Sequence, residues 1–337
     1  MSKNIKNILV AGAGGFIGGH LVKRLLMNDN IIVAADIKPK EYWFQDFDEV
    51  DAHYSTDMKD IIKCREITKN IDYVFNMACN MGGMGFIENN KAECMQSVLI
   101  NTNLLIASRE NKIKKYFFSS SACAYNIQKQ QGVFIEGLKE EDAYPANPED
   151  GYGWEKLFSE RMCRHFMEDY GLEVRIARYH NIYGPYGTYD GGREKAPAAL
   201  CRKIFLAKSN KKNKIEVWGD GKQTRTFLYI DDCIDGTLKL FDSDYSSPVN
   251  IGSDEQVSIN QMVQLIEKIS EIKELEKVYL LDKPKGVRGR SSNNDLVKKV
   301  LNWSYQISLG IGLKKTYDWI SSDISRSGSN INRFTKP

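Results

Sequence analysis

The sequence predicts an α/β fold, in which a doubly wound parallel sheet is joined by a smaller, interleaved C-terminal lobe. Short apolar runs alternate with longer amphipathic stretches through the first 180 or so residues. A strand–helix alternation of this kind is typical of parallel strands with helices on both faces of the sheet. After residue 180 the alternation changes, yet no linker-like segment divides the chain. The second lobe is therefore expected to interleave with the first.

The individual elements follow from periodicity and from turn residues. The expected strands are brief apolar runs, and the expected helices carry apolar residues three or four apart. In order, we predict strands at 7–11, 31–35, 73–77, 115–119 and 173–179, and helices at 16–28, 60–69, 90–111 and 152–170. Beyond them we predict a loop dense in Gly, Pro and Tyr at 181–192, a helix at 196–207, a basic loop at 208–214, a strand at 215–218, an extended piece at 223–230, and helices at 231–241 and 258–269. Ser258 is the expected N-cap of the last helix.

Composition narrows the class of protein. The 337 residues are 42% hydrophobic and 27% charged, as expected for a globular chain with a substantial core. A formal charge of +3 gives no reason to expect nucleic acid or a membrane as a partner, and no apolar run approaches the roughly 20 residues of a spanning helix. The 7 cysteines include no Cys-x-x-Cys pair, which argues against disulfides and a structural metal site. We expect a cytoplasmic protein without a metal.

A glycine turn follows the first predicted strand. Gly12 permits a tight turn, Gly15 lets the backbone approach a pyrophosphate, and Gly18 allows close packing of helix on strand. Phe16 and Ile17 open the helix, whose amino terminus offers N–H donors and a positive dipole end to phosphates. This strand–turn–helix setting predicts a Rossmann-type dinucleotide site.

Acidic residues behind the glycine turn indicate the cofactor. Asp36 ends the second strand, where its carboxylate would accept hydrogen bonds from ribose hydroxyls and repel a 2′-phosphate. NAD is therefore favoured over NADP, although Lys38 weakens that preference. Asp57 is placed either to meet the adenine amino group or to cap a helix.

Tyr152 and Lys156 lie one helical turn apart on one face of the predicted helix. A phenol of pKa about 10 can take a hydroxyl proton only if a nearby cation, here Lys156 with a bound nicotinamide, lowers that pKa. Ser121, just past the strand at 115–119, would hold the substrate hydroxyl at the carboxyl edge of the sheet. These three residues suffice for sugar oxidation.

Cys123 and Lys195 add a thiol and an amine, which carbon-centred proton transfer requires. Oxidation at C4 of a hexose makes C3 and C5 acidic, and inversion needs one acid and one base on opposite faces of the ring. A thiolate with an ammonium would serve, if burial, neighbours or cofactor charge bring both groups closer to neutral pH. Cys123 could instead be a packed thiol, and Lys195 a phosphate contact. The pair Ala122-Cys123 does not fit a 4,6-dehydratase, which would have Asp-Glu at positions 122 and 123 to eliminate water. It also does not fit an epimerase that inverts C4 only, which needs no acid or base at these positions.

With these residues in place, the chain resembles the extended short-chain dehydrogenase/reductases, and within them the NAD-dependent epimerase/dehydratase family. The resemblance runs from about residue 8 to 319, and is densest at 76–86, 120–123, 178–199 and 218–225. The Met-Gly-Gly-Met-Gly stretch at 81–85 and the Gly-Gly-Arg-Glu-Lys-Ala-Pro stretch at 191–197 narrow it to the GDP-mannose 3,5-epimerases.

That resemblance implies roles for particular residues. Cys123 and Lys195 would be the epimerising acid and base, Tyr152 the base at the C4 hydroxyl, and Lys156 its support. The implied contacts of the GDP-sugar are Gly82, Ser121, Cys123, Asn181, Glu194, Lys195, Ala196, Lys203, Gln223, Arg225 and either Arg288 or Arg290. The chain departs from the family pattern at Asn80, Asn293 and Asn302, where acidic residues and a glycine are usual. His180 is interpreted as a hydrogen-bonded residue at a strand end.

The resemblance also implies an activity and a domain plan. It implies epimerisation of GDP-mannose at C3 and C5 to GDP-L-galactose, with GDP-L-gulose; the alternatives are an epimerase of another GDP-hexose or of C4 only, and a non-catalytic NAD sensor. We expect an NAD-binding domain at 1–180 with returning segments at about 223–252, a nucleotide-sugar lobe at 181–222 and 253–322, and a flexible tail at 323–337. By analogy we expect a homodimer that pairs through the helices at 90–111 and 152–170.

Overall fold

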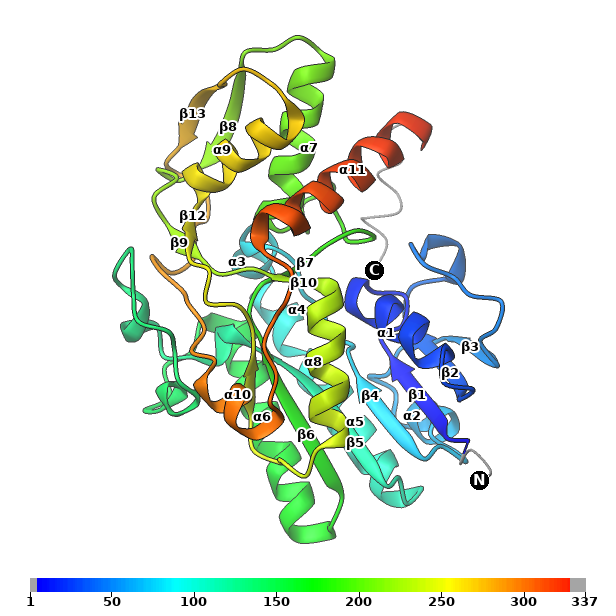
Figure 1. Cartoon of the computed structure of the whole chain (residues 1–337). Helices are drawn as coiled ribbons and strands as arrows, with labels where there is room; N and C mark the ends of the chain where they lie inside the picture. The colour runs from blue at the N-terminus through cyan, green and yellow to red at the C-terminus, as the bar shows by residue number, and fades with distance from the viewer. Residues whose placement is uncertain (1–4, 328–337) are drawn as a thin grey trace.

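The computed structural model describes residues 5–327, and its centre is a parallel sheet of seven strands (Figure 1). The spatial order is β11-β6-β5-β4-β1-β2-β3, so the order reverses between β1 and β4. The strands are β1 (Asn7–Ala11), β2 (Ile31–Asp36), β3 (Ala52–Ser55), β4 (Tyr73–Asn76), β5 (Lys115–Ser121), β6 (Glu173–Tyr179) and β11 (Val249–Ile251). The predicted doubly wound parallel sheet is confirmed.

Helices cover both faces of this sheet (Figure 1). They are α1 (Phe16–Leu26), α2 (Ile61–Ile67), α4 (Lys91–Met95), α5 (Ser97–Glu110), α6 (Asp150–Tyr170) and α8 (Ile230–Asp242). The short helix α3 (Met84–Asn89) contacts α4 and α6. Helix α1 packs on α8, and α5 packs on both α2 and α6. Within β1, Ile8 and Val10 join one hydrophobic core while Leu9 and Ala11 join another, as the two-residue period of a strand requires.

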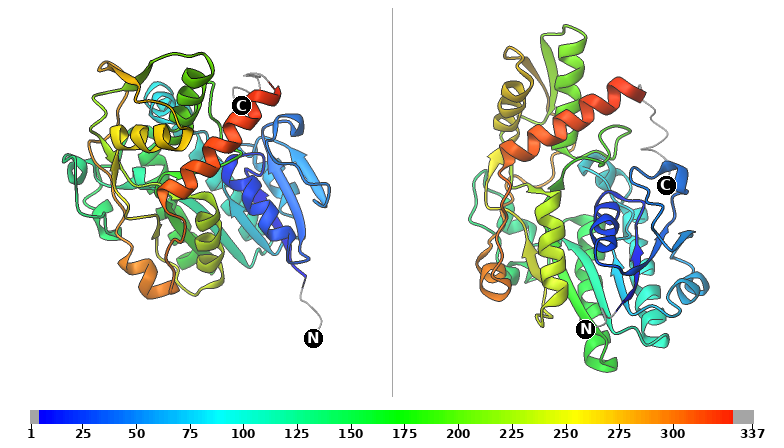
Figure 2. Two further views of the ribbon diagram at one scale, coloured as in Figure 1. Left: turned by 45° about the horizontal axis from the view of Figure 1, so that its top comes forward. Right: turned by 45° about the vertical axis from the view of Figure 1, so that its right-hand side comes forward.

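The smaller lobe is built from the later part of the chain (Figure 2). Its elements are α7 (Ala196–Ser209), β8 (Lys214–Trp218), α9 (Ile259–Ser270), β13 (Glu276–Leu280) and α11 (Leu309–Ser327). Strand β8 pairs with β13, and α7 packs on α9 and α11. The remaining short elements are spread over the whole described chain. They are β7 (Ile182–Tyr183), β9 (Thr224–Arg225), β10 (Leu228–Tyr229), β12 (Val257–Ser258), α10 (Asp295–Leu301) and 3-10 turns at Lys40–Tyr42, Ala122–Ala124, Ile127–Gln130 and Glu140–Ala143.

Several predicted boundaries hold and others need correction. Ser258 caps α9 as predicted, since its Oγ accepts a hydrogen bond from the Gln261 N–H at 3.1 Å. The single helix predicted at 90–111 is wrong, because α4 ends at Met95 and α5 begins at Ser97. Ser121 is the last residue of β5 and does not lie beyond the strand.

The tail was predicted to begin too early. Helix α11 continues to Ser327, and the Tyr189 hydroxyl donates a hydrogen bond to Asp323 Oδ2 at 2.8 Å. Residues 323–327 are therefore helical, while 328–337 lie outside the described residues. The division of the chain into an NAD-binding domain and a nucleotide-sugar lobe stays a prediction. No helix between residues 5 and 327 is both long and apolar enough to cross a membrane.

Asn302 shows how the chain accommodates one departure from the family pattern. It ends α10 in the left-handed conformation, with φ of 48° and ψ of 45°. Glycine is the usual residue in that conformation, and asparagine is among the residues that tolerate it best. The substitution therefore preserves the turn that leads to α11.

Candidate active site

One cavity of about 1010 Å³ follows the carboxyl edge of the large sheet and continues under α7 and β8. This edge, at the reversal of strand order, is where doubly wound sheets bind their ligands. Of the predicted site residues, only Lys156 and Arg288 do not line the cavity. Those on its wall are Gly12, Gly15, Phe16, Ile17, Gly18, Asp36, Asp57, Gly82, Ser121, Cys123, Tyr152, Asn181, Glu194, Lys195, Ala196, Lys203, Gln223, Arg225 and Arg290.

The glycine turn forms one end of the cavity. Gly12 has φ of 84°, and a Cβ on it would lie 2.8 Å from the backbone nitrogen of Ala78. A Cβ on Gly18 would lie 2.0 Å from the Gly12 carbonyl oxygen, so helix α1 packs directly on the turn. Gly15 is the N-cap of α1, whose first N–H groups have no partners within the helix. Bare backbone beside a helix amino terminus fits a dinucleotide pyrophosphate.

Two carboxylates lie near this turn. Asp36 accepts hydrogen bonds from the N–H groups of Gly14 at 3.0 Å and Lys38 at 2.9 Å, and burial raises its pKa. Asp36 is the last residue of β2 and lines the cavity, at the position where the ribose of a dinucleotide would lie. Asp57 also lines the cavity, and its alternative role as helix cap is wrong, because Asp60 caps α2.

The predicted hydride-transfer residues come from α6 and β5. Lys156 is 1% exposed and lies behind the cavity wall, with its Nζ 5.5 Å from the centroid of the Tyr152 ring. Burial raises the pKa of the Tyr152 phenol well above its usual value, nearby Cys79 and Glu155 raise it further, and a hydrogen bond with Ser121 lowers it. The predicted lowering of this pKa is thus not achieved by the protein alone, because desolvation outweighs the hydrogen bond with Ser121.

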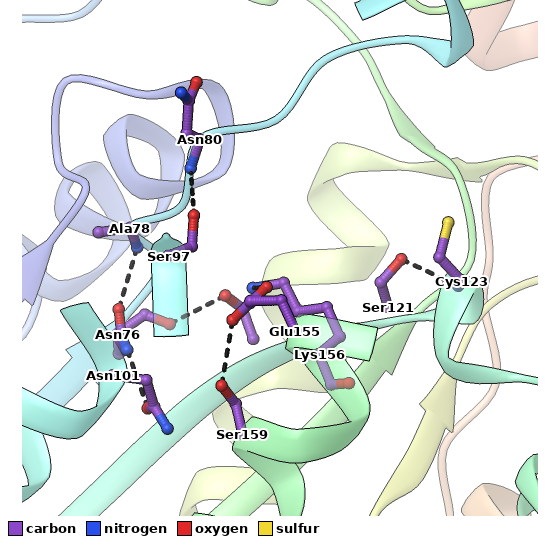
Figure 3. Close-up of polar contacts among 12 residues, drawn as sticks. Asn76, Ala78, Asn80, Ser97, Asn101, Ser121, Cys123, Glu155, Lys156 and Ser159 are labelled. Carbon is purple, nitrogen blue, oxygen red and sulfur yellow. Dashed lines mark hydrogen bonds and ion pairs between the residues drawn. The ribbon is translucent and has the colours of Figure 1, made fainter. Parts of the chain in front are cut away.

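Cys123 lies at the centre of the cavity in a buried polar cluster. It follows β5 directly, and its N–H donates to Ser121 Oγ at 3.2 Å (Figure 3). The Arg290 guanidinium donates to Cys123 Sγ at 3.4 Å, to Glu149 Oε2 at 2.7 Å and to Gln130 Oε1 at 2.7 Å. Burial raises the pKa of the Cys123 thiol, while the Arg290 charge lowers it and the Glu149 charge raises it.

Lys195 faces the same cavity from the N-cap position of α7. Burial lowers the pKa of its ammonium, which the neighbouring Cys123 and Cys79 raise in part. Burial therefore moves Cys123 toward the thiol and Lys195 toward the amine, opposite to the thiolate and ammonium that we predicted. Whether the proton lies on the sulfur or on the nitrogen, one of the two groups is an acid and the other is a base.

The glycine-rich stretch at 81–85 has a packing role beside Lys195. A Cβ on Gly83 would lie 2.3 Å from the Glu194 carbonyl oxygen, and the Gly83 N–H donates to the Arg193 carbonyl at 2.9 Å. Arg193 in turn donates to Asn80 Oδ1 at 2.8 Å. Glycine at this position lets the segment carrying Lys195 lie directly against the chain that follows β4. Asn80, which departs from the family pattern, joins the two segments.

Cationic side chains gather at the far end of the cavity. Arg225 is buried, and burial together with the nearby Arg290 charge lowers its pKa to about 10. Lys203 also faces the cavity. Arg288 is turned away, since its guanidinium pairs with both carboxylate oxygens of Asp220 at 2.9 Å. Of the two arginines left open by the sequence, Arg290 is the one on the wall.

Comparison with known proteins decides the family. Residues 8–252 match the NAD dependent epimerase/dehydratase family. The chain belongs to this family. GDP-mannose 3,5-epimerase of Arabidopsis thaliana is 44% identical over 99% of this chain and 87% of that protein. GDP-mannose 3,5-epimerase 1 of Oryza sativa subsp. indica is 45% identical over 95% of this chain and 82% of that protein.

A solved structure agrees with the cofactor of this family. UDP-glucuronic acid 4-epimerase of Bacillus cereus, solved with UDP-glucuronic acid and NAD, superposes with a TM-score of 0.79 at 26% identity, covering 94% of this chain and 99% of that one. The family is NAD-dependent, and the glycine turn with Asp36 fits that cofactor. Among the described side chains, no group of three or more His, Cys, Asp or Glu is arranged to hold a metal ion.

Reasoning from sequence missed three residues in or beside this site. Glu149 pairs with Arg290, and Glu155 lies 3.5 Å from the Lys156 ammonium. Their signal was available, since both acids lie within three residues of Tyr152. Cys79 was interpreted as an incidental thiol, but it lines the cavity.

His180 is confirmed as a structural residue at the end of β6. It is buried, and its Nε2 forms a hydrogen bond with Asn250 Oδ1 at 2.8 Å.

Proposed function

We propose that this protein epimerises GDP-mannose at C3 and C5, to give GDP-L-galactose together with GDP-L-gulose. The observation that carries the proposal is that the thiol of Cys123 and the amine of Lys195 line the same cavity as Tyr152. Dehydrogenation at C4 alone needs neither. The plant relatives at 44% and 45% identity bear the name of this activity.

The chemistry begins at C4 of the hexose. Bound NAD would accept the hydride from C4, which makes C4 a ketone, and would give the hydride back to C4 at the end of the cycle. A ketone at C4 acidifies the hydrogens on C3 and C5, because an enolate spreads the resulting charge. Tyr152 takes the proton of the C4 hydroxyl and later gives it back, while Ser121 holds the C4 oxygen.

Cys123 and Lys195 would invert the configuration at C3 and C5. One group removes the hydrogen from the ring carbon, and the other delivers a proton to the opposite face. Buried side chains with one proton between them suit this task, since one is always an acid and the other a base. The Arg290 guanidinium stabilises negative charge on the Cys123 sulfur at 3.4 Å.

The far end of the cavity suits the nucleotide diphosphate. Arg225 is buried in this wall, and a diphosphate would neutralise its positive charge. Arg290 lies nearer Cys123, where its charge is already paired with Glu149. Lys203 adds a further cation. Gln223 Oε1 is buried and has no hydrogen-bond partner among the described residues, so it can accept from a ligand donor.

Proton exchange tests the activity. Purified protein with its bound NAD is incubated with GDP-mannose in deuterium oxide, and the sugar is examined by NMR. Deuterium at both C3 and C5 is expected. Inversion at C4 without deuterium, or exchange only with another GDP-hexose, would replace the proposal with the related epimerase. No exchange with any GDP-hexose would leave a non-catalytic NAD-binding protein.

Substitution of Cys123 and of Lys195 tests whether these two side chains carry out the deuterium exchange. Cys123→Ala and Lys195→Met should each lower exchange by at least about a hundredfold, the contribution of a general acid or base. Absorbance of bound NADH should still appear with Cys123→Ala, because C4 oxidation does not use the thiol. Full turnover by either variant would refute its assigned role.

Assembly and location extend the proposal. Large apolar side chains are about half exposed on the neighbouring helices α4, α5 and α6, namely Met95, Leu99, Trp154 and Phe158. A second copy of the chain packed on these helices would bury them, so we propose a homodimer. A cytoplasmic location stays a prediction.

A further inference from the structure

A carboxylate lies beside the lysine of the hydride-transfer site and has no role in the chemistry above. Glu155 immediately precedes Lys156 on α6, and both side chains are 1% exposed. Figure 3 shows the two side chains together above Ser159, away from Ser121 and Cys123. Burial of an acid and a base in one place is costly unless each stabilises the charge of the other.

The hydrogen bonds of Glu155 leave one oxygen for Lys156. Ser159 Oγ donates to Glu155 Oε1 at 3.1 Å. Glu155 Oε2 is buried without a close hydrogen bond, and it lies 3.5 Å from the Lys156 ammonium. The Cys79 thiol is a further neighbour of the ammonium. Two aromatic rings also lie beside it, with Nζ 4.8 Å from the Phe118 ring centroid and 5.5 Å from that of Tyr152.

We propose that Glu155 is a positioning residue of the hydride-transfer site, which holds the Lys156 ammonium and offsets its charge, so that Tyr152 can return a proton as well as take one. The inference rests on the proposed function. In a net isomerisation the phenol must reprotonate the C4 oxygen in every cycle. A phenolate stabilised too strongly by Lys156 would keep the C4 ketone unreduced.

The groups that face this pair come from several elements. Cys79 follows β4, Cys94 lies on α4, Tyr116 on β5 and Cys163 on α6, and burial raises the pKa of each. Cys123 and Lys195 approach from the cavity. Burial also raises the pKa of Glu155, while the Lys156 charge and the hydrogen bond from Ser159 lower it. Glu155 is the carboxylate among these neighbours, and its pairing with Lys156 favours its charged form.

Glu155 acts on both members of the pair. Burial lowers the pKa of Lys156, and Cys79 and then Glu155 raise it. The charge of Glu155 also adds to the rise that burial produces in the pKa of Tyr152. Removal of this charge therefore lowers the pKa of the phenol, because a nearby like charge disfavours the phenolate, and we expect a shift of about one unit.

The test is a titration of the NAD-bound protein without substrate. Phenolate absorbance is followed against pH, and the part lost in Tyr152→Phe belongs to Tyr152. With Glu155→Gln the midpoint should fall by about one pH unit. Glu168→Gln, which removes an exposed carboxylate from the same helix, should leave the midpoint unchanged. An equal midpoint in wild type and Glu155→Gln would overturn the inference.

Substrate gives a second readout. During turnover of GDP-mannose, Glu155→Gln should hold a larger fraction of its cofactor as NADH than wild type does. Should Glu155→Gln fail to fold, Ser159→Ala provides the test, because loss of its hydrogen bond favours the protonated Glu155 and shifts the midpoint in the same direction. A midpoint unmoved in that variant would also count against the inference. Failure of the proposed function would appear separately, as wild-type protein that exchanges no deuterium into GDP-mannose.

Discussion

Arg290 Nη1 donates a hydrogen bond to Cys123 Sγ at 3.4 Å, although the two residues are 167 positions apart in the chain. The same guanidinium is paired with Glu149 at 2.7 Å, and it is buried. A cation fixed against a buried sulfur partly offsets the desolvation that raises the pKa of the thiol. This contact is the clearest means by which the fold prepares Cys123 for proton transfer.

Loss of that cation should make Cys123 less reactive. In Arg290→Met the pKa of the thiol rises, and at constant pH its alkylation by iodoacetamide should slow by about tenfold, the effect of one pKa unit. Mass spectrometry of the Cys123 peptide measures the rate. Arg288→Met is the matched control, because Arg288 pairs with Asp220 outside the cavity.

Stability complicates the same experiment. Arg290→Met leaves Glu149 buried without its cation, a change that typically costs about 3–5 kcal/mol of unfolding free energy. The double variant Arg290→Met/Glu149→Gln removes both charges and should recover most of that loss. An alkylation rate equal to wild type in the folded double variant would contradict the role of Arg290.

The glycine turn should not tolerate a side chain at Gly18. In Gly18→Ala the added Cβ would lie 2.0 Å from the Gly12 carbonyl oxygen, so the backbone of the turn must move. Overpacking of this kind typically costs about 1–3 kcal/mol, and NAD affinity should fall with it. Calorimetric titration with NAD and thermal unfolding measure the two effects. Gly310→Ala should leave NAD affinity unchanged and should not lower thermal stability, because its added Cβ meets no atom from outside its own stretch of α11 within 4 Å. Wild-type NAD affinity in Gly18→Ala would show that the turn does not bind the cofactor.

The proposed dimer depends on apolar side chains of α6. The double variant Trp154→Asp/Phe158→Glu places charges on residues that are 45% and 52% exposed, and a buried unpaired charge strongly opposes association. Light scattering after size-exclusion chromatography should give a dimer for wild type and a monomer for the variant. Leu281→Asp alters a leucine that is 62% exposed, just after β13, and should remain a dimer. A monomeric wild-type protein would contradict the proposed assembly.

Acid should destabilise the protein partly through His180. Burial lowers the pKa of this imidazole from 6.5 to about 3. Above pH 6.5 the group is neutral in both the folded and the unfolded chain, and it contributes no pH dependence. As the pH falls from 6.5 toward 3 the unfolded chain binds the proton first, so the free energy of unfolding falls by about 1.4 kcal/mol per pH unit.

Denaturant unfolding at two pH values checks this expectation. Between pH 7 and pH 5, His180→Asn should lose about 2 kcal/mol less unfolding free energy than wild type. His165→Asn, an exposed histidine on α6, should behave as wild type. The same pH dependence in wild type and His180→Asn would show that another group is responsible.

Local spacing was sufficient for much of this protein. The alternation of strands and helices, the glycine turn after β1, the Ser258 cap and the one-turn separation of Tyr152 and Lys156 all depend on residues close together in the chain. Backbone periodicity places such residues relative to one another whatever the rest of the fold does. For that reason the parallel sheet and the residues along its carboxyl edge could be predicted.

Contacts between distant segments were decided only in the folded molecule. The sequence left Arg288 and Arg290 as equal candidates, interpreted Cys79 as incidental and overlooked Glu149 and Glu155. Whether Cys123 and Lys195 carry charge depends on how completely they are desolvated and on which cations and carboxylates surround them. Desolvation and the approach of residues 167 positions apart are properties of tertiary packing, so no local pattern could report them.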